Sequence, residues 1–159
     1  LTEKFAKNEN VSLFNFAMDK EISKKKLKIN KISMKSSLAE VNENSLYLKF
    51  INFLAQSKSS FEGEYEVKTT TVDKIFEDIN LQKALLKIDV EGFEMNVIKG
   101  SQMKLGEISF IMLENQFGNH FKNNNFKDIT KFLSERNFMI SKKFLFPTLH
   151  YQDVLFKKT

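Results

Sequence analysis

The sequence predicts an α/β domain whose sheet is mostly parallel and ends in an antiparallel hairpin. Strand-like and helix-like segments alternate along its second half, and the apolar runs 84–89 and 108–113 are typical of parallel strands covered on both faces. The last two strand-like segments, 139–146 and 153–158, are joined by only six residues. That link is long enough for antiparallel pairing but too short for a parallel crossover.

The first half of the chain reads as strands around a long insertion. Residues 10–18 and 26–32 alternate apolar and polar side chains, so we expect two strands, the second in an exposed ribbon paired with a neighbour. Residues 64–72 are rich in β-branched side chains and predict a third strand. The segment 34–63 is predicted to be a lid or insertion that contains a short helix. Its apolar residues at helical spacing are Leu46, Phe50, Phe53 and Leu54.

Helices are predicted over three segments of the second half. Residues 73–79 form a short helix, with Asp73 placed to cap its first turn. Residues 92–99 form a second helix that ends at Gly100. Residues 126–138 form a third helix with an apolar face. The residues on that face are Phe126, Ile129, Phe132 and Leu133.

Length and composition fit a single domain over residues 1–159, because 42% apolar residues suffice for a core. The absence of cysteine excludes disulfides and thiolate chemistry. No apolar run of about 18 residues and no secretion signal occur, so we expect a cytoplasmic protein with no membrane partner. The formal charge is +5, with lysines clustered at 24–31. These lysines alternate with apolar residues without interleaved aromatic residues, so we expect no nucleic-acid partner.

Three carboxylates fall where the chemistry of an open α/β sheet is usually found. Such sheets bind ligands beyond the C-terminal ends of their parallel strands. Asp89 and Glu91 follow one predicted strand, and Glu114 ends the next. Because like charges held close together raise the pKa of at least one carboxyl, such a group could accept a hydroxyl proton or hold a divalent cation.

The same residues also have a structural explanation, and the residue pattern alone leaves both explanations open. Asp89 could cap the helix that follows, and Glu91 with Glu94 could lie favourably near its positive end. Gly92 could relieve a tight turn, and Glu114 could be a solvated strand end.

The stretch LLKIDVEGFEMNVIKGS resembles the signature of the FkbM family of S-adenosylmethionine-dependent methyltransferases. The match is nearly complete over residues 87–92 and continues through Glu94, Lys99 and Gly100. Flanking segments agree in order and spacing, so that the resemblance covers the chain apart from residues 39–63. These segments are NVSLFNFAMDKE, SSL at 36–38, VKTTTVDKIF at 67–76, ISFIMLEN and DVLFKK.

The resemblance implies a class I methyltransferase (Rossmann-like) fold, a seven-stranded sheet whose last strand inserts antiparallel. It also implies S-adenosyl-L-methionine as the cofactor and a hydroxyl of a sugar or another small molecule as the acceptor. On the family pattern, Asp89 lies beside the transferred methyl, and Glu91 or Glu114 orients or deprotonates the acceptor. The turn that would contact the adenine consists of Ala17, Met18 and Asp19.

Part of the family pattern would precede Leu1. The first strand, the Gly-rich cofactor loop and the acidic residue for the ribose are not found here, and the five glycines form no G-x-G. Residues 1–10 read as the tail of a helix. We therefore expect a fold that is incomplete at its N-terminus, binds the cofactor weakly or not at all by itself and is inactive alone, while the activity belongs to a longer parent protein. The alternative is a non-catalytic or degenerate module that acts through binding or by pairing with another chain.

Three other residues are weaker candidates for chemistry. His120 lies in the loop after the strand that ends at Glu114 and could act as a general base, although a solvated loop histidine is the commoner case. His150 lies in the turn of the final hairpin, and two histidines so far apart predict no zinc site. Lys87 shares a strand face with Asp89, which favours a structural ion pair over a role in holding an acidic substrate.

Overall fold

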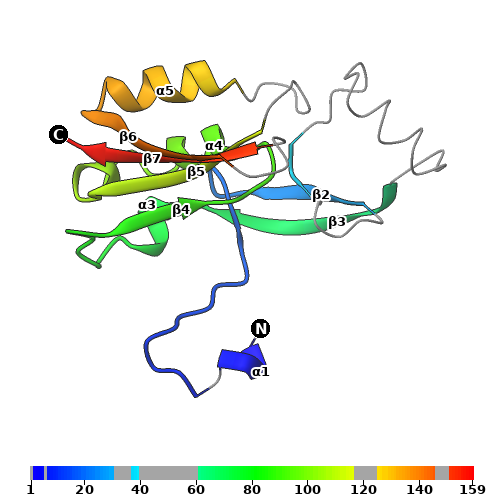
Figure 1. Cartoon of the computed structure of the whole chain (residues 1–159). Coiled ribbons are helices and arrows are strands. Elements are labelled where there is room, and N and C mark those ends of the chain that lie inside the picture. The colour runs from blue at the N-terminus through cyan, green and yellow to red at the C-terminus, as the bar shows by residue number, and fades with distance from the viewer. Residues whose placement is uncertain (1, 6, 31–36, 40–60, 117–124, 146–150) are drawn as a thin grey trace.

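The computed structural model describes residues 2–5, 7–30, 37–39, 61–116, 125–145 and 151–159, and it arranges them as a mixed α/β fold with two sheets (Figure 1). The prediction of an α/β fold is therefore confirmed. The smaller sheet has the order β1-β3-β2, with β1 (Ala17–Met18), β2 (Lys24–Asn30) and β3 (Phe61–Thr70). The larger sheet has the order β4-β5-β7-β6, with β4 (Leu85–Ile88), β5 (Phe110–Gln116), β6 (Phe138–Leu145) and β7 (Tyr151–Lys158).

The larger sheet has the predicted C-terminal hairpin. β4 and β5 are parallel, with Ile88 opposite Leu113. β7 lies between β5 and β6 and is antiparallel to both, so the last strand is inserted as expected. β1 pairs parallel with β3, whereas β2 pairs antiparallel with it. Two of the five described pairings are thus parallel and three are antiparallel. The expected parallel majority is not found among the described strands, because the inserted β7 and the β2–β3 ribbon supply antiparallel pairings.

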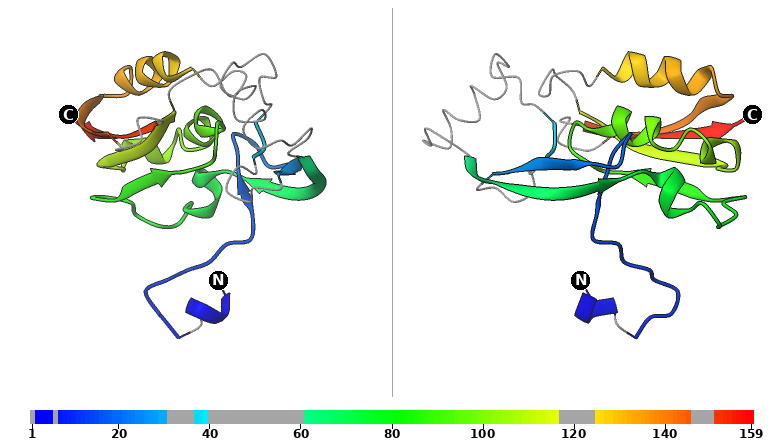
Figure 2. Two further views of the ribbon diagram at one scale, coloured as in Figure 1. Left: turned by 45° about the vertical axis from the view of Figure 1, so that its right-hand side comes forward. Right: turned by 180° about the vertical axis from the view of Figure 1, so that it is seen from behind.

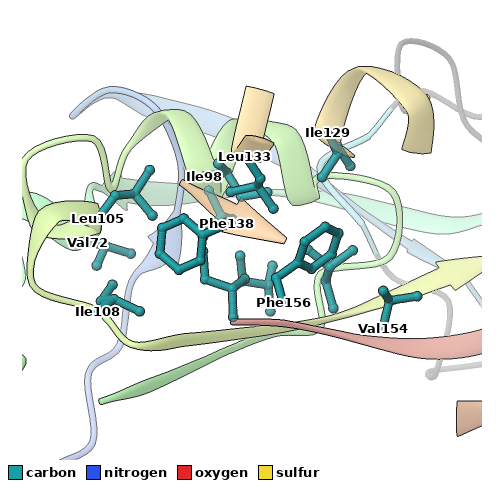
Figure 3. Close-up of a cluster of buried hydrophobic side chains, with 13 residues drawn as sticks. Val72, Ile98, Leu105, Ile108, Ile129, Leu133, Phe138, Val154 and Phe156 are labelled. Atoms are coloured by element: carbon teal, nitrogen blue, oxygen red, sulfur yellow. The ribbon is translucent and has the colours of Figure 1, made fainter. Parts of the chain in front are cut away.

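Two helices, α4 (Glu94–Lys99) and α5 (Phe126–Ser134), pack on one face of the larger sheet. Figure 3 shows Ile98 and Leu133 of these helices close to Phe138 and Phe156 of the sheet. Burying each such side chain stabilises the fold by about 1.5–3 kcal/mol, so this core holds the helices in place. The other members of the buried cluster are Val72, Ile88, Val97, Leu105, Ile108, Ile111, Leu113, Ile129 and Val154.

The opposite face of the larger sheet is more open. Residues that pair across strands share a face, so Leu85, Phe110, Lys157 and Met139 form one row across all four strands. Leu85 and Met139, at the two ends of this row, are 55% and 56% exposed. The prediction that the strand at 84–89 is covered on both faces is therefore wrong for the described part of the chain, since α4 and α5 pack on the other face.

The N-terminal residues contribute less to the sheets than predicted. Of the strand expected over 10–18, only Ala17–Met18 is β structure, because these are the residues that pair with β3. Phe14 and Phe16, just before them, are exposed. The expected helical segment at the start of the chain is α1 (Thr2–Phe5), and Figure 2 shows it standing away from the rest of the described residues.

The predicted insertion at 34–63 is only partly described. β3 begins at Phe61, inside the predicted segment, and its residues up to Lys68 pair with the whole of β2 as the expected exposed ribbon. Residues 37–39 are described, and backbone hydrogen bonds of 3.2 Å join Ser37 to Lys28 of β2 in both directions. The short helix predicted around Phe50 lies outside the described residues.

The described helices are short, and none is both long and apolar enough to cross a membrane. α3 (Val72–Ile75) is capped by Thr71, whose hydroxyl oxygen accepts a 3.0 Å hydrogen bond from the Lys74 amide. The prediction that Asp73 caps this helix is therefore wrong. The Asp73 carboxylate instead accepts hydrogen bonds from the amides of Met103 and Lys104, at the start of the 3₁₀ helix η2 (Lys104–Gly106).

Candidate active site

The candidate site begins at the turn that joins β4 to α4. Glu91 and Gly92 both adopt left-handed backbone conformations, with φ of 49° and 89°, so α4 starts only at Glu94. The N-cap position of α4 is Phe93, and no side chain caps it. The structural alternative in which Asp89 caps this helix is therefore wrong. Asp89 is left at the open end of β4 with its side chain exposed.

Lys87 and Asp89 form an ion pair at this end of β4. The Lys87 ammonium lies 2.9 Å from Asp89 Oδ2, and both side chains are about half exposed. The hydrogen bond and charge of Asp89 raise the pKa of Lys87, and the charges of Asp153 and Glu114 add to this effect. The expected Lys87–Asp89 pair is thus present, and it has two further carboxylates as neighbours.

Glu114 reaches the same place from β5. Asp89 and Glu114 each come one residue after the paired Ile88 and Leu113, so they lie side by side where the parallel pairing of β4 with β5 ends. The prediction that Glu114 ends its strand is wrong by two residues, because β5 continues to Gln116 in its pairing with β7. Across the other edge of β5, Glu114 is opposite Asp153 of β7. The predicted convergence of Asp89 and Glu114 is therefore found, on the more open face of the sheet.

Tyr151 completes this group. It lies two residues before Asp153 in β7 and so shares its face. Burial raises the pKa of the Tyr151 phenol, and the negative charges of Glu114, Asp153 and Asp89 raise it further. The phenol therefore stays protonated at neutral pH and can donate a hydrogen bond. We call Lys87, Asp89, Glu114, Tyr151 and Asp153 the rim cluster.

Glu91 occupies the turn itself and is half-buried. Its carbonyl accepts a 2.6 Å hydrogen bond from the hydroxyl of Ser37, a residue from the start of the predicted insertion.

His120 and His150 lie outside the described residues. Within the described ranges no group of three or more histidines and carboxylates is arranged to hold a metal ion.

The predicted adenine-contacting turn lies in the smaller sheet. Ala17 and Met18 are half-buried, whereas the side chain of Asp19 is completely buried. The Asp19 carboxylate forms an ion pair with Lys25 of β2 and accepts a 3.2 Å hydrogen bond from the side chain of Asn96 in α4. Asp19 therefore links the smaller sheet to α4.

Sequence reasoning missed Tyr151, Asp153 and Ser37 as members of the site. The first two could have been found, because an antiparallel last strand begins at the edge where its parallel neighbour ends. Alternation along that strand then puts both side chains on the face of Glu114. Ser37 lies in the segment SSL, which resembles the family, but nothing in that segment indicated its contact, since its hydrogen bond to Glu91 joins residues 54 positions apart.

Two sheets with an antiparallel last strand, and carboxylates where the parallel pairing of β4 with β5 ends, are consistent with a methyltransferase-like fold. The sequence identifies the family. The model of the Methyltransferase FkbM domain matches residues 3–140, so the chain belongs to the FkbM methyltransferase family.

A curated relative supports this assignment. The hexuronic acid methyltransferase AglP of Haloferax volcanii is 37% identical over 79 residues, which cover 49% of this chain and 31% of the relative. The chain thus spans about a third of the length of that relative. No solved structure matches the chain.

Proposed function

We propose that the complete protein transfers a methyl group from S-adenosylmethionine to a hydroxyl of a sugar or another small molecule. The observation that carries this proposal is that Asp89 and Glu114 lie side by side where the parallel pairing of β4 with β5 ends, in a member of a methyltransferase family. The relative is named as a hexuronic acid methyltransferase, which supports a sugar as the acceptor. A cytoplasmic location stays a prediction from the sequence.

The described residues suit part of the chemistry of this cofactor. S-adenosylmethionine, when bound, supplies an electrophilic methyl group on a sulfonium cation. The carboxylates of Asp89 and Glu114 are favourable neighbours for a cation. Ala17 and Met18 offer half-buried apolar side chains for the adenine. The carboxylate of Asp19 is held by Lys25 and Asn96. In this proposal Asp19 therefore stabilises the conformation of the turn at residues 17–19 and does not contact the adenine itself.

The residues of the site would align the acceptor and take its proton. S-adenosylmethionine, if bound here, would supply the methyl group to the acceptor oxygen and would leave as the neutral thioether. The hydroxyl proton passes to a carboxylate, for which Glu114 is our first candidate and Glu91 the second. Asp89 orients the reacting groups, and the protonated Tyr151 donates a hydrogen bond to the acceptor. A positioned general base typically contributes about 10²–10⁴-fold to the rate.

The test is methyl transfer by the complete protein. It would be incubated with labelled S-adenosylmethionine and a panel of sugar and small-molecule alcohols. Asp89→Asn and Glu114→Gln are each expected to lower turnover by at least about 100-fold. Their circular dichroism spectra should stay unchanged, because both side chains lie at the rim of the sheet and outside its core.

Matched controls separate the site from general charge effects. Asp128→Asn and Glu135→Gln make the same chemical changes on exposed positions near the two ends of α5, and they should keep full turnover. Wild-type turnover in both Asp89→Asn and Glu114→Gln would contradict the catalytic assignment.

A further inference from the structure

The peptide unit between Glu91 and Gly92 is held at both of its polar ends. Its carbonyl oxygen accepts the 2.6 Å hydrogen bond from the hydroxyl of Ser37. Its amide donates a 3.0 Å hydrogen bond to the carboxylate of Glu94. Ser37 and Glu94 are both buried, with exposed fractions of 5% and 3%. The two contacts therefore act on one peptide plane, well shielded from water.

This peptide plane needs such support because the backbone around it is strained. The φ of Glu91 is 49°, a left-handed conformation that residues other than glycine seldom adopt. Such conformations persist only where surrounding contacts over-determine them, and they cluster at functional sites. Gly92, with φ of 89°, adopts its conformation without a Cβ penalty. The strain at Glu91 thus has to be balanced by the contacts of Ser37 and Glu94.

The hydroxyl of Ser37 is itself fixed in direction. Its oxygen accepts a 2.9 Å hydrogen bond from the amide of Ala39. Its proton can then point to the Glu91 carbonyl at 2.6 Å, which is much closer than the Val90 carbonyl at 3.4 Å. The backbone of Ser37 is anchored by its two hydrogen bonds to Lys28. A rigid path therefore runs from β2 through Ser37 to the turn that carries Asp89 and Glu91.

We propose that Ser37 is a positioning residue for methyl transfer: its hydroxyl, opposite Glu94, holds the Glu91–Gly92 peptide in the conformation that aims Asp89 and Glu91 at the reacting groups. This inference rests on the function proposed above. Ser37 contacts the backbone of the turn and acts through it. Losing its hydroxyl releases the carbonyl of Glu91, and the turn relaxes toward an unstrained conformation. Small displacements of aligned groups can lower a rate by about 100-fold.

The test compares serine variants of the complete protein in steady-state methyl transfer. Ser37→Ala is expected to lower kcat at least about tenfold with little change in KM, because the bound substrate is held but poorly aligned. Ser37→Thr keeps the hydroxyl and should recover most of kcat. Ser37→Cys, with a weak donor of similar size, should behave like Ser37→Ala and carries the test if the alanine variant does not fold.

Ser101→Ala is the matched control. Ser101 is also buried and also donates from its hydroxyl to a backbone carbonyl, that of Val97 at 2.7 Å. Its loss should lower the unfolding temperature about as much as Ser37→Ala while leaving kcat unchanged. An equal fall of kcat in both alanine variants would reduce Ser37 to a structural role and overturn the inference, as would a wild-type kcat in Ser37→Ala.

Hydrogen exchange of the Gly92 amide tests, independently of activity, whether Ser37 and Glu94 hold the Glu91–Gly92 peptide in place. Hydrogen exchange of the Gly92 amide should be faster in Ser37→Ala than in the wild type and in Ser101→Ala, because the peptide plane loses one of its two contacts. Unchanged exchange would overturn the inference. If the wild-type protein methylates no acceptor but exchange at Gly92 responds as expected, the proposed function is wrong. The contact of Ser37 with the Glu91–Gly92 peptide is then still confirmed.

Discussion

A Cβ atom added to Gly100 would lie 2.0 Å from the carbonyl oxygen of Asp19. The C-terminal end of α4 therefore packs directly on the backbone that follows β1. Together with the contact between the Asp19 carboxylate and Asn96, this approach joins the smaller sheet to the helical layer of the larger one. A glycine is needed at position 100 because a side chain would collide with the backbone of Asp19. Its backbone conformation does not require glycine, since a φ of −81° is open to any residue.

Gly100→Ala is expected to destabilise the fold by about 3 kcal/mol, because the added methyl meets backbone atoms that no rotamer change can move. Chemical denaturation monitored by circular dichroism would measure the loss. Gly106→Ala is the control, since a Cβ there meets nothing within 4 Å. A wild-type midpoint for Gly100→Ala would show that the two segments are further apart in solution.

Asp19→Ala is expected to lower the free energy of unfolding by about 2–3 kcal/mol. The change removes a completely buried carboxylate and leaves Lys25 with Glu21 as its acidic partner, at 3.3 Å. Urea denaturation would measure the loss. Glu66→Ala removes an exposed pairing with Lys24 and should hardly move the midpoint. Equal midpoints for the two variants would argue against the Asp19 link.

Glu107 should make stability depend on pH in the acid range. The backbone amide of Leu81, followed by the ammonium of Lys104, holds the pKa of Glu107 below its ordinary value of 4.5. The stabilisation is therefore fully present above pH 4.5 and is lost as the pH falls through the folded-state pKa. Glu107→Gln should be less stable than the wild type at neutral pH, with the gap closing in acid. Thermal unfolding midpoints from neutral to acid pH would measure this difference, with Glu135→Gln as the control. A difference between wild type and Glu107→Gln that stays constant with pH would contradict the role of Glu107.

The pKa of Tyr151 should report on the charges of the rim cluster. Burial and the carboxylates of Glu114 and Asp153 hold it above 10.0, whereas Lys87 lowers it. Glu114→Gln and Asp153→Asn should each lower the pKa of Tyr151, and Lys87→Met should raise it. Ring-labelled tyrosine NMR over a pH titration would follow the three shifts. A pKa that is the same in every variant would mean that these charges lie far from the phenol.

Local signals predicted much of the larger sheet. The continuous apolar runs identified β4 and β5, and the length of the last connection identified the β6–β7 hairpin, because both signals depend on residues close in sequence. The residues at which helices end were less predictable. α5 ends at Ser134 and not at 138, since Asn137 adopts a φ of 65° directly before β6.

Long-range contacts account for what sequence reasoning missed. Thr71 and Asp73 are both good capping residues, and the choice of Thr71 depends on where Asp73 finds other partners, some 30 positions along the chain. In the site, Asp89 and Glu114 followed from the rule about strand ends. The burial of Asp19 did not, because Asn96 contacts it from 77 residues away.

The position of β7 has a consequence for biosynthesis. β7 follows β4, β5 and β6 along the chain, yet among the described strands β6 pairs with β7 alone. A nascent chain that has emerged from the ribosome as far as Leu145 therefore holds β6 without the strand with which it pairs. We expect the larger sheet to close in one late step, after Lys158 has cleared the exit tunnel, so that the edges of β5 and β6 that face β7 stay unpaired until then.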